Sequence, residues 1–218
     1  MDVLTDCWRE IWHSPGALPY PGLLADLLRR YAEPQRHYHT AAHIAECLCL
    51  WRQFANRCAR PELVGLALFY HDAVYRPERR DNESRSADYA CRMLAQTRLP
   101  AADAQTVADW INATRSHRNP YPPDYPLHHD LNLLLDADLA ILGAEPARFA
   151  QYQGQIRAEY QKVHPQTYRR RRRKVLQAFA CRQPLFQTAW FRERFERQAK
   201  ENLKTARGGK PDITPIRP

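Results

Sequence analysis

The sequence predicts an all-α fold, and three observations support that prediction. Apolar residues recur at spacings of three, four and seven through most of the 218 residues, and no segment alternates convincingly as a strand would. Prolines and helix-capping residues divide this pattern into segments of helical length. The content of 44% hydrophobic and 26% charged residues is typical of a globular protein. We expect a single domain over residues 1–206 and a flexible C-terminal tail over 207–218.

The first predicted helices lie in the amino-terminal half of the chain. Residues 39–55 place their apolar side chains on one stripe, which is typical of an amphipathic helix. Pro61 opens a segment, 61–75, that is apolar on nearly every side and should form a central helix. Two further helices are expected over 82–96 and 101–116.

A proline-rich loop separates these helices from the rest. Residues 117–129 contain four prolines and cannot continue a helix. Asp130 is expected to cap a short buried helix over 131–142, with Gly143 as a left-handed residue at its end. Three more helices are predicted at 146–163, 167–182 and 187–206.

Composition excludes several classes of protein. The seven glycines never form GxG or GxxxxGK, which excludes glycine-loop nucleotide binding. No window holds the roughly 18 uninterrupted apolar residues of a membrane helix, and the charged opening MDVLTDCWREIW is unlike a signal peptide. The six cysteines contain no CxxC pair and are expected to be reduced, structural thiols. We therefore expect a cytoplasmic protein that does not bind membranes.

The basic charge is concentrated in the last third of the chain. The formal net charge is 33 − 24 = +9, and residues 151–218 carry 17 Lys and Arg against 5 Asp and Glu. The run from Arg169 to Lys174 is the peak of this charge and could bind a nucleic acid or another polyanion. A solvated helix face is the alternative, because the run contains no aromatic residue on which bases could stack.

Histidines and acidic residues in apolar segments are the candidates for chemistry. His39 and His43 are four residues apart, which would place both imidazoles on one helical face. His71 and Asp72 lie inside the apolar segment, where a carboxylate is costly unless it meets a cation or several donors. A metal ion would supply that cation, although each histidine alone is also explained as a hydrogen-bonded core residue. Imidazole and carboxylate ligands favour Mn, Fe, Mg or Co ahead of Zn.

A second pair of acids lies in the segment 131–142. Asp136 and Asp138 are both surrounded by apolar residues. They differ by about 200° around a helix, so at most one can face a given site. Periodicity does not choose between them.

These residues resemble a known superfamily. The order His43, then His71-Asp72, then Asp138 resembles the H…HD…D motif of the HD-domain metal-dependent phosphohydrolases, which are all-helical. The segment YHTAAH is similar to the YHNxxH motif of cyclic-nucleotide phosphodiesterases in that superfamily, with Thr40 in place of Asn. The likeness narrows to a small family of HD-type phosphohydrolases of unassigned substrate. It spans residues 20–205 and is carried by RHYHTAAHI, FYHDAVY, DNESRSA, ATRSH and LLLDADLAILG.

The resemblance implies a role for each motif residue. Residues 1–206 would be an HD-type phosphohydrolase domain in which His39 donates a proton. Asp136 would lie just outside the ligand set. One ion is favoured over two. The implied metal ligands are His43, His71, Asp72 and Asp138.

Further residues near these motifs have two interpretations each. The resemblance places DNE beside the metal, which makes Glu83 a candidate for orienting water. Glu83 is also explained as a solvated acid in the first turn of a helix. Asp81 is equally explained as a helix cap. Arg36 and Arg115 could hold phosphate oxygens, or could be ordinary surface residues. Two-metal HD proteins recruit additional histidines from regions such as those of His117, His128 and His129.

The predicted activity is metal-assisted hydrolysis of a phosphate ester, with a phosphorylated small molecule, preferably a nucleotide, as substrate. One alternative is a helical module that binds nucleic acid or another polyanion through Arg169–Lys174 and whose metal site is structural or vestigial. Another is an HD-fold oxygenase with two irons. The sequence predicts no particular oligomeric state.

Overall fold

Several helices begin at prolines of the sequence, and apolar side chains of these helices are buried. The computed structural model describes residues 2–208, and that range contains helices, turns and loops but no strand, which confirms the all-α prediction. The predicted tail lies outside the described residues except for its first two, which extend the last helix to Gly208. No helix in the described range is long and apolar enough to cross a membrane.

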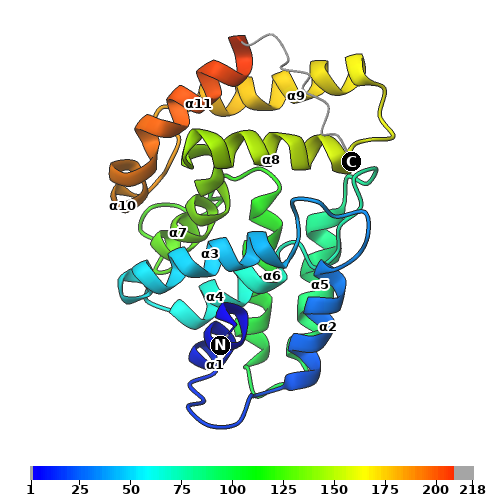
Figure 1. The fold of residues 1–218 in the computed structure, drawn as a ribbon. Helices are drawn as coiled ribbons and strands as arrows, with labels where there is room; N and C mark the ends of the chain where they lie inside the picture. The colour runs from blue at the N-terminus through cyan, green and yellow to red at the C-terminus, as the bar shows by residue number, and fades with distance from the viewer. Residues whose placement is uncertain (1, 209–218) are drawn as a thin grey trace. The chain divides into compact units, whose positions relative to one another are not determined.

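The chain divides into two compact units, residues 1–139 and 140–218. The first unit contains most of the helices labelled in Figure 1. Its elements are α1 (Val3–Ile11), α2 (Pro21–Tyr31), α3 (Ala41–Phe54), the 3₁₀ turn η1 (Ala55–Arg57), α4 (Pro61–Tyr70), α5 (Asn82–Leu94), α6 (Ala101–Thr114) and α7 (His128–Leu139).

The helix α4 is the centre of the first unit, as predicted. Every residue from Leu63 to Tyr70 is buried, and α1, α3, α6 and α7 pack around them. The predicted extension of this helix to residue 75 is wrong, because α4 ends at Tyr70. The backbone beyond leaves the helix, and the carbonyls of Asp72 and Ala73 accept hydrogen bonds from a buried arginine side chain instead of helical amides. His71 and Asp72 therefore lie at a helix end.

Asp130 does not cap the helix that the sequence suggested. Because α7 already begins at His128, Asp130 lies inside its first turn. Its buried carboxylate accepts hydrogen bonds from the backbone N–H groups of Ala59 at 3.0 Å and Arg60 at 2.7 Å, just before α4. This contact satisfies two backbone donors of the segment that leads into α4 and ties that segment to α7.

Asp81 also departs from its predicted role. It occupies the N-cap position of α5, but its side chain makes no capping hydrogen bond and pairs with Arg79 and Arg85.

The six cysteines form no disulfide. Cys7 and Cys47 are buried, whereas Cys49 and Cys181 are exposed, so only part of the set are structural core thiols.

The second unit is built around α9 and α11, which pack against each other (Figure 1). The prediction of a left-handed conformation at Gly143 is wrong, because its φ is not positive. A side chain there would place its Cβ 2.6 Å from the carbonyl oxygen of Phe195, so the glycine permits a close approach of two backbones. The elements are η2 (Ala140–Gly143), α8 (Pro146–Glu159), α9 (Pro165–Ala180), α10 (Ala189–Phe191), the π-helical turn η3 (Arg192–Glu196) and α11 (Arg197–Gly208).

Glu196 gives the second unit a pH-dependent contribution to stability. Its carboxylate accepts hydrogen bonds from the backbone N–H groups of Leu185 and Phe186 and pairs with Lys200. Burial would raise the pKa of this carboxyl, but the two amides and the ammonium lower it below its ordinary value. A lowered folded-state pKa stabilises the fold above the unfolded-state pKa, and the contribution is lost as the pH falls toward the folded-state pKa.

We expect Glu196→Gln to reduce the free energy of unfolding by about 1–2 kcal/mol at pH 7, because hydrogen bonds to a charged group are replaced by weaker ones. The difference from wild type should shrink below about pH 4, where the unfolded carboxyl is protonated. Urea denaturation at both pH values measures it. Glu201→Gln is the control, because that side chain is 55% exposed and pairs only at the surface with Arg197. A difference for Glu196→Gln that grew on acidification would contradict this prediction.

Candidate metal centre

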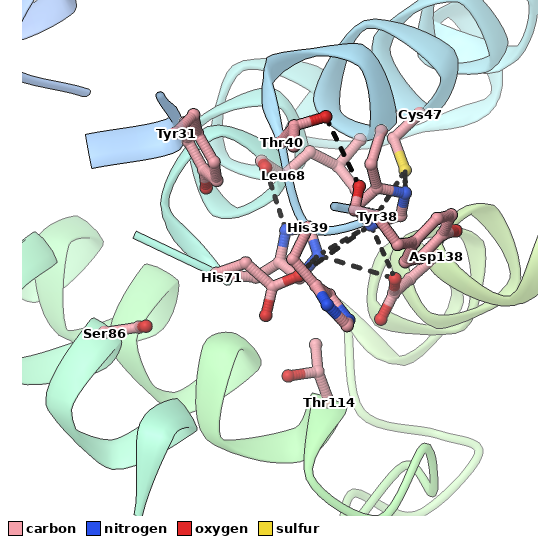
Figure 2. A network of polar contacts seen from close by, with 12 residues as sticks. Tyr31, Tyr38, His39, Thr40, Cys47, Leu68, His71, Ser86, Thr114 and Asp138 are labelled. Atoms are coloured by element: carbon pink, nitrogen blue, oxygen red, sulfur yellow. Dashed lines mark hydrogen bonds and ion pairs between the residues drawn. The ribbon is translucent and has the colours of Figure 1, made fainter. Parts of the chain in front are cut away.

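The ends of three helices bring two histidines and two aspartates together in the first unit. His43 lies in the first turn of α3, His71 and Asp72 follow the last residue of α4, and Asp138 lies in the last turn of α7. Figure 2 shows the imidazole of His71 and the carboxylate of Asp138 turned toward a common point. All four residues predicted as ligands therefore meet in one place.

The distances between their polar atoms are those between neighbouring ligands of one ion. His43 Nε2 lies 3.3 Å from His71 Nε2 and 3.2 Å from Asp138 Oδ1. His71 Nε2 lies 3.1 Å from Asp72 Oδ2 and 3.4 Å from Asp138 Oδ1. The longest of these separations is 3.8 Å, from His43 Nε2 to Asp72 Oδ2. Ligand atoms about 2.1 Å from an ion are about 3.0–3.4 Å apart in octahedral or tetrahedral geometry, so the set fits a divalent metal.

The tautomer of His71 also suits a ligand. Its Nδ1 lies 2.9 Å from the carbonyl oxygen of Leu68, which can only accept, so Nδ1 carries the proton and donates it. In the neutral ring the lone pair is then on Nε2, the atom that faces His43 and the two carboxylates. A second ring nitrogen held by a carbonyl is the usual way in which proteins orient a metal-binding imidazole.

Asp138 uses its second oxygen to bind another histidine. His117 Nε2 lies 2.8 Å from Asp138 Oδ2, while Oδ1 faces His43 and His71. His117 follows α6 in a left-handed conformation, with φ of 47°. Non-glycine residues with positive φ are uncommon and gather at functional sites. This finding chooses Asp138 over Asp136, which periodicity left open.

Cys47 lies beside the cluster, but its sulfur does not lie along the Nε2 lone pair of His43. Two overlapping groups in the described range could hold an ion, His43 with His71 and Asp72, and His43 with Cys47 and Asp138. The Cys47 sulfur is 3.8 Å from His43 Nδ1 and 3.9 Å from Nε2. Nearly equal distances to both nitrogens place the sulfur beside the ring rather than along the Nε2 lone pair. Burial also raises the pKa of the Cys47 thiol well above its ordinary value, so the histidine and carboxylate set fits an ion better.

Opposite charges overcome the cost of burial in this cluster. Burial lowers the pKa of His71, but Asp72 and Asp138 raise it well above the ordinary value of histidine. Burial raises the pKa of Asp72, but His71 and His39 hold it below its usual range. The pKa of Asp138 is lowered in the same way by His71, His117 and His43. An ion that binds here must displace a proton from His71, so its binding should weaken at acid pH.

The side chain of Arg36 donates hydrogen bonds to backbone carbonyls and is not available to a phosphate. It is fully buried, and its Nη1 donates to the carbonyl oxygens of His39 at 3.0 Å and Asp72 at 2.7 Å. Its Nη2 donates to the carbonyl of Ala73 at 3.1 Å, and its Nε faces Glu33. The predicted phosphate contact is therefore corrected to a positioning role. One guanidinium joins the segment before α3 to the turn after α4.

We expect Arg36→Lys to weaken metal binding about 10–100-fold, which is the usual effect of losing a group that orients ligands. Lysine keeps the charge but cannot hold three carbonyls in a fixed fork. Competition with a chromophoric chelator measures the metal Kd. Arg85→Lys is the matched control, because that arginine is half exposed and pairs with Asp81. An unchanged Kd in Arg36→Lys would contradict the positioning role.

His39 lies near the cluster but not on the helix of His43. The helix α3 begins after Thr40, whose hydroxyl accepts a hydrogen bond from the N–H of Ala42, so the predicted shared helical face is wrong. The His39 ring instead stacks on Tyr75 with centroids 4.1 Å apart, and its centroid lies 6.1 Å from that of His43. Proximity of the two imidazoles was correctly expected, but a loop and a stacked tyrosine produce it.

The DNE segment supports the loop after α4. Asn82 accepts from the N–H of Arg76 at 3.0 Å and donates to its carbonyl at 2.9 Å. Ser86 makes the same pair of contacts with Val74, at 3.1 and 3.2 Å, and Figure 2 shows it apart from the imidazole cluster. Glu83 is half-buried in the first turn of α5, and its role in orienting water stays a prediction.

The remaining candidate residues lie in several environments. Arg115 is exposed at the C-cap of α6, where phosphate binding stays a prediction. His128 Nδ1 donates to the carbonyl of Tyr121 at 3.0 Å, within the proline-rich loop, and His129 is exposed. Asp136 is buried on α7.

The sequence did not reveal the contacts of two residues that support the cluster. Tyr75 was not a candidate, and His117 was named without a partner. Both reach the site from loops, where periodicity gives no direction for a side chain. The DNE motif was the only available signal for the contacts of Asn82 and Ser86.

Comparison of the chain with family models, curated proteins and solved structures finds no match. The fold and the site by themselves define an all-α protein whose first unit carries a cluster of imidazoles and carboxylates that could hold a metal ion.

Proposed function

We propose that the chain is a metal-dependent phosphohydrolase that cleaves a phosphate ester, with nucleotides as the favoured substrate class. The observation that carries this proposal is the convergence of His43, His71, Asp72 and Asp138 at the ends of three helices. The two imidazoles lie 3.3 Å from each other and 3.1–3.8 Å from the two carboxylates. The resemblance to the H…HD…D motif supports the choice of phosphate chemistry.

The cluster favours one ion of Mn, Fe, Mg or Co ahead of Zn, because its ligands are imidazoles and carboxylates and no thiolate is in line with them. We favour one ion over two, because the two groups of side chains that could hold an ion in the described range share His43. Such an ion supplies Lewis acidity, which polarises a phosphoryl oxygen and makes water more acidic.

His39 is the candidate proton donor to the leaving oxygen. Its backbone carbonyl is held by Arg36 and its ring by Tyr75, so its position is fixed from two sides. It lies next to the cluster without belonging to either group of side chains that could hold an ion. A fixed imidazole beside the reacting phosphate can give its proton to an alkoxide leaving group as a general acid.

The test is a screen of the full chain, purified without chelator, against nucleoside monophosphates, cyclic nucleotides, nucleoside triphosphates and nitrophenyl phosphate. Each substrate is tested with Mn, Mg and Co, in air and under nitrogen. Metal-dependent release of phosphate or of the free alcohol in both atmospheres is expected. Stoichiometric metal without turnover of any substrate would overturn the hydrolase and favour a structural metal site. Oxygen-dependent turnover would instead favour the oxygenase alternative.

A further inference from the structure

The positive charge of the chain is concentrated in the second unit, whereas the four candidate metal ligands belong to the first. Residues 140–208 contain 16 Lys and Arg against 5 Asp and Glu, a difference of +11. Within this unit α9 contains the densest basic run and no acidic residue. The metal centre of the first unit uses none of these side chains.

The basic run divides into one packed arginine and an exposed set. Arg172 is turned inward, where its Nε and Nη2 donate to Gln153 Oε1 at 3.0 and 2.7 Å and its guanidinium lies 5.0 Å from the ring of Tyr152. The exposed set, here called the basic face, consists of Arg169, Arg170, Arg171, Arg173 and Lys174.

The basic face covers more than half of the circumference of α9. At about 100° per residue the five side chains span an arc of about 200°. The opposite side carries Arg172 and Leu176, and Leu176 is only 3% exposed. None of the five forms an ion pair with a residue in the described range 2–208. Two acids of the same unit pair with other cations, Glu196 with Lys200 and Glu201 with Arg197.

We propose that the basic face binds the phosphate backbone of a nucleic-acid duplex. Four of its five cations are arginines, whose guanidinium groups match phosphate oxygens in a fork. Cations on both flanks of one helix suit phosphates that lie on two sides of it, as the two strands of a duplex provide. Charge complementarity is therefore the basis of recognition, and base sequence is not read.

Two other polyanionic partners fit this face less well. A helix that lies on a membrane inserts an apolar side into the lipid, but the buried side chain of α9, Leu176, belongs to the core of the unit itself. A single strand is usually held by aromatic side chains that stack on its bases, and the run from Arg169 to Lys174 contains none.

The experiment measures binding of the full chain to a fluorescent 20-base-pair duplex by anisotropy at 50–200 mM salt. Five phosphate contacts predict a slope of about −4.5 for log K against log salt, or a loss of about 500-fold in affinity over that range. Changing all five basic-face residues to Gln should remove most of this slope. Two duplexes of unrelated sequence should bind equally.

The matched control removes the same number of charges from exposed arginines of the first unit. It carries Gln at Arg57, Arg76, Arg80, Arg92 and Arg118. This control should keep nearly the whole salt slope, and both variants should keep the thermal midpoint of the wild type. Equal losses in both variants would show that net charge alone drives binding and would overturn the proposal. Tighter binding to a single strand, or to vesicles of anionic lipid, would also overturn it.

Discussion

His71→Ala and Asp72→Ala are expected to purify without the stoichiometric metal of the wild-type chain and without hydrolytic activity. Each change removes a candidate ligand that lies 3.1–3.8 Å from at least two of the others. Each also leaves opposite charges unpaired in a buried place, which is costly by itself. Metal analysis of protein purified without chelator, together with phosphate release, measures both losses.

Cys47→Ala separates the two groups that could hold an ion. Its sulfur lies beside the ring of His43, so its removal should leave the metal content unchanged. Chelation of the wild type should lower the thermal midpoint, because an ion bound only to the folded state stabilises it by mass action. The midpoint of Asp72→Ala should be insensitive to chelator. Retained metal in His71→Ala and Asp72→Ala, or its loss in Cys47→Ala, would refute this ligand set.

Much of the fold could be predicted from the helical spacing of apolar residues and from the prolines that start and end helices. The all-round apolar character of residues 63–70 identified α4 as central, and prolines marked its start and the loop before α7. The helices α1 and α2 were not among the predicted elements. The ends of helices were predicted less well, because tertiary contacts decide where a helix stops.

His71 and Asp72 illustrate this limit. Their apolar neighbours suggested a position in the middle of a helix, but the carbonyl of Asp72 is bound by Arg36 from another segment. No local pattern reveals a hydrogen bond between residues 36 positions apart. Asp138 is oriented likewise by His117, which reaches its second oxygen from the end of α6. The identities of the candidate ligands were thus readable from sequence, whereas the groups that orient them were not.

The variants His39→Ala and His43→Ala are expected to lose activity for different reasons. His43 Nε2 lies within 3.3 Å of His71 and Asp138, so His43→Ala should lose metal and activity together. His39 stacks on Tyr75 outside the ligand set, so His39→Ala should keep its metal. If His39 is the general acid, its loss should slow hydrolysis of a nucleotide by about 10²–10⁴-fold.

The leaving group of the substrate makes this prediction specific to proton donation. Nitrophenolate is a stable anion and needs little protonation as it departs, whereas the alkoxide of a nucleotide needs a proton. His39→Ala should therefore hydrolyse nitrophenyl phosphate with a much smaller deficit than a nucleotide. Tyr75→Leu is the companion variant, since it removes the stacked ring and should lower kcat on the nucleotide while leaving metal content intact. Equal deficits of His39→Ala on both substrates, or loss of metal from this variant, would make His39 a positioning or coordinating residue instead.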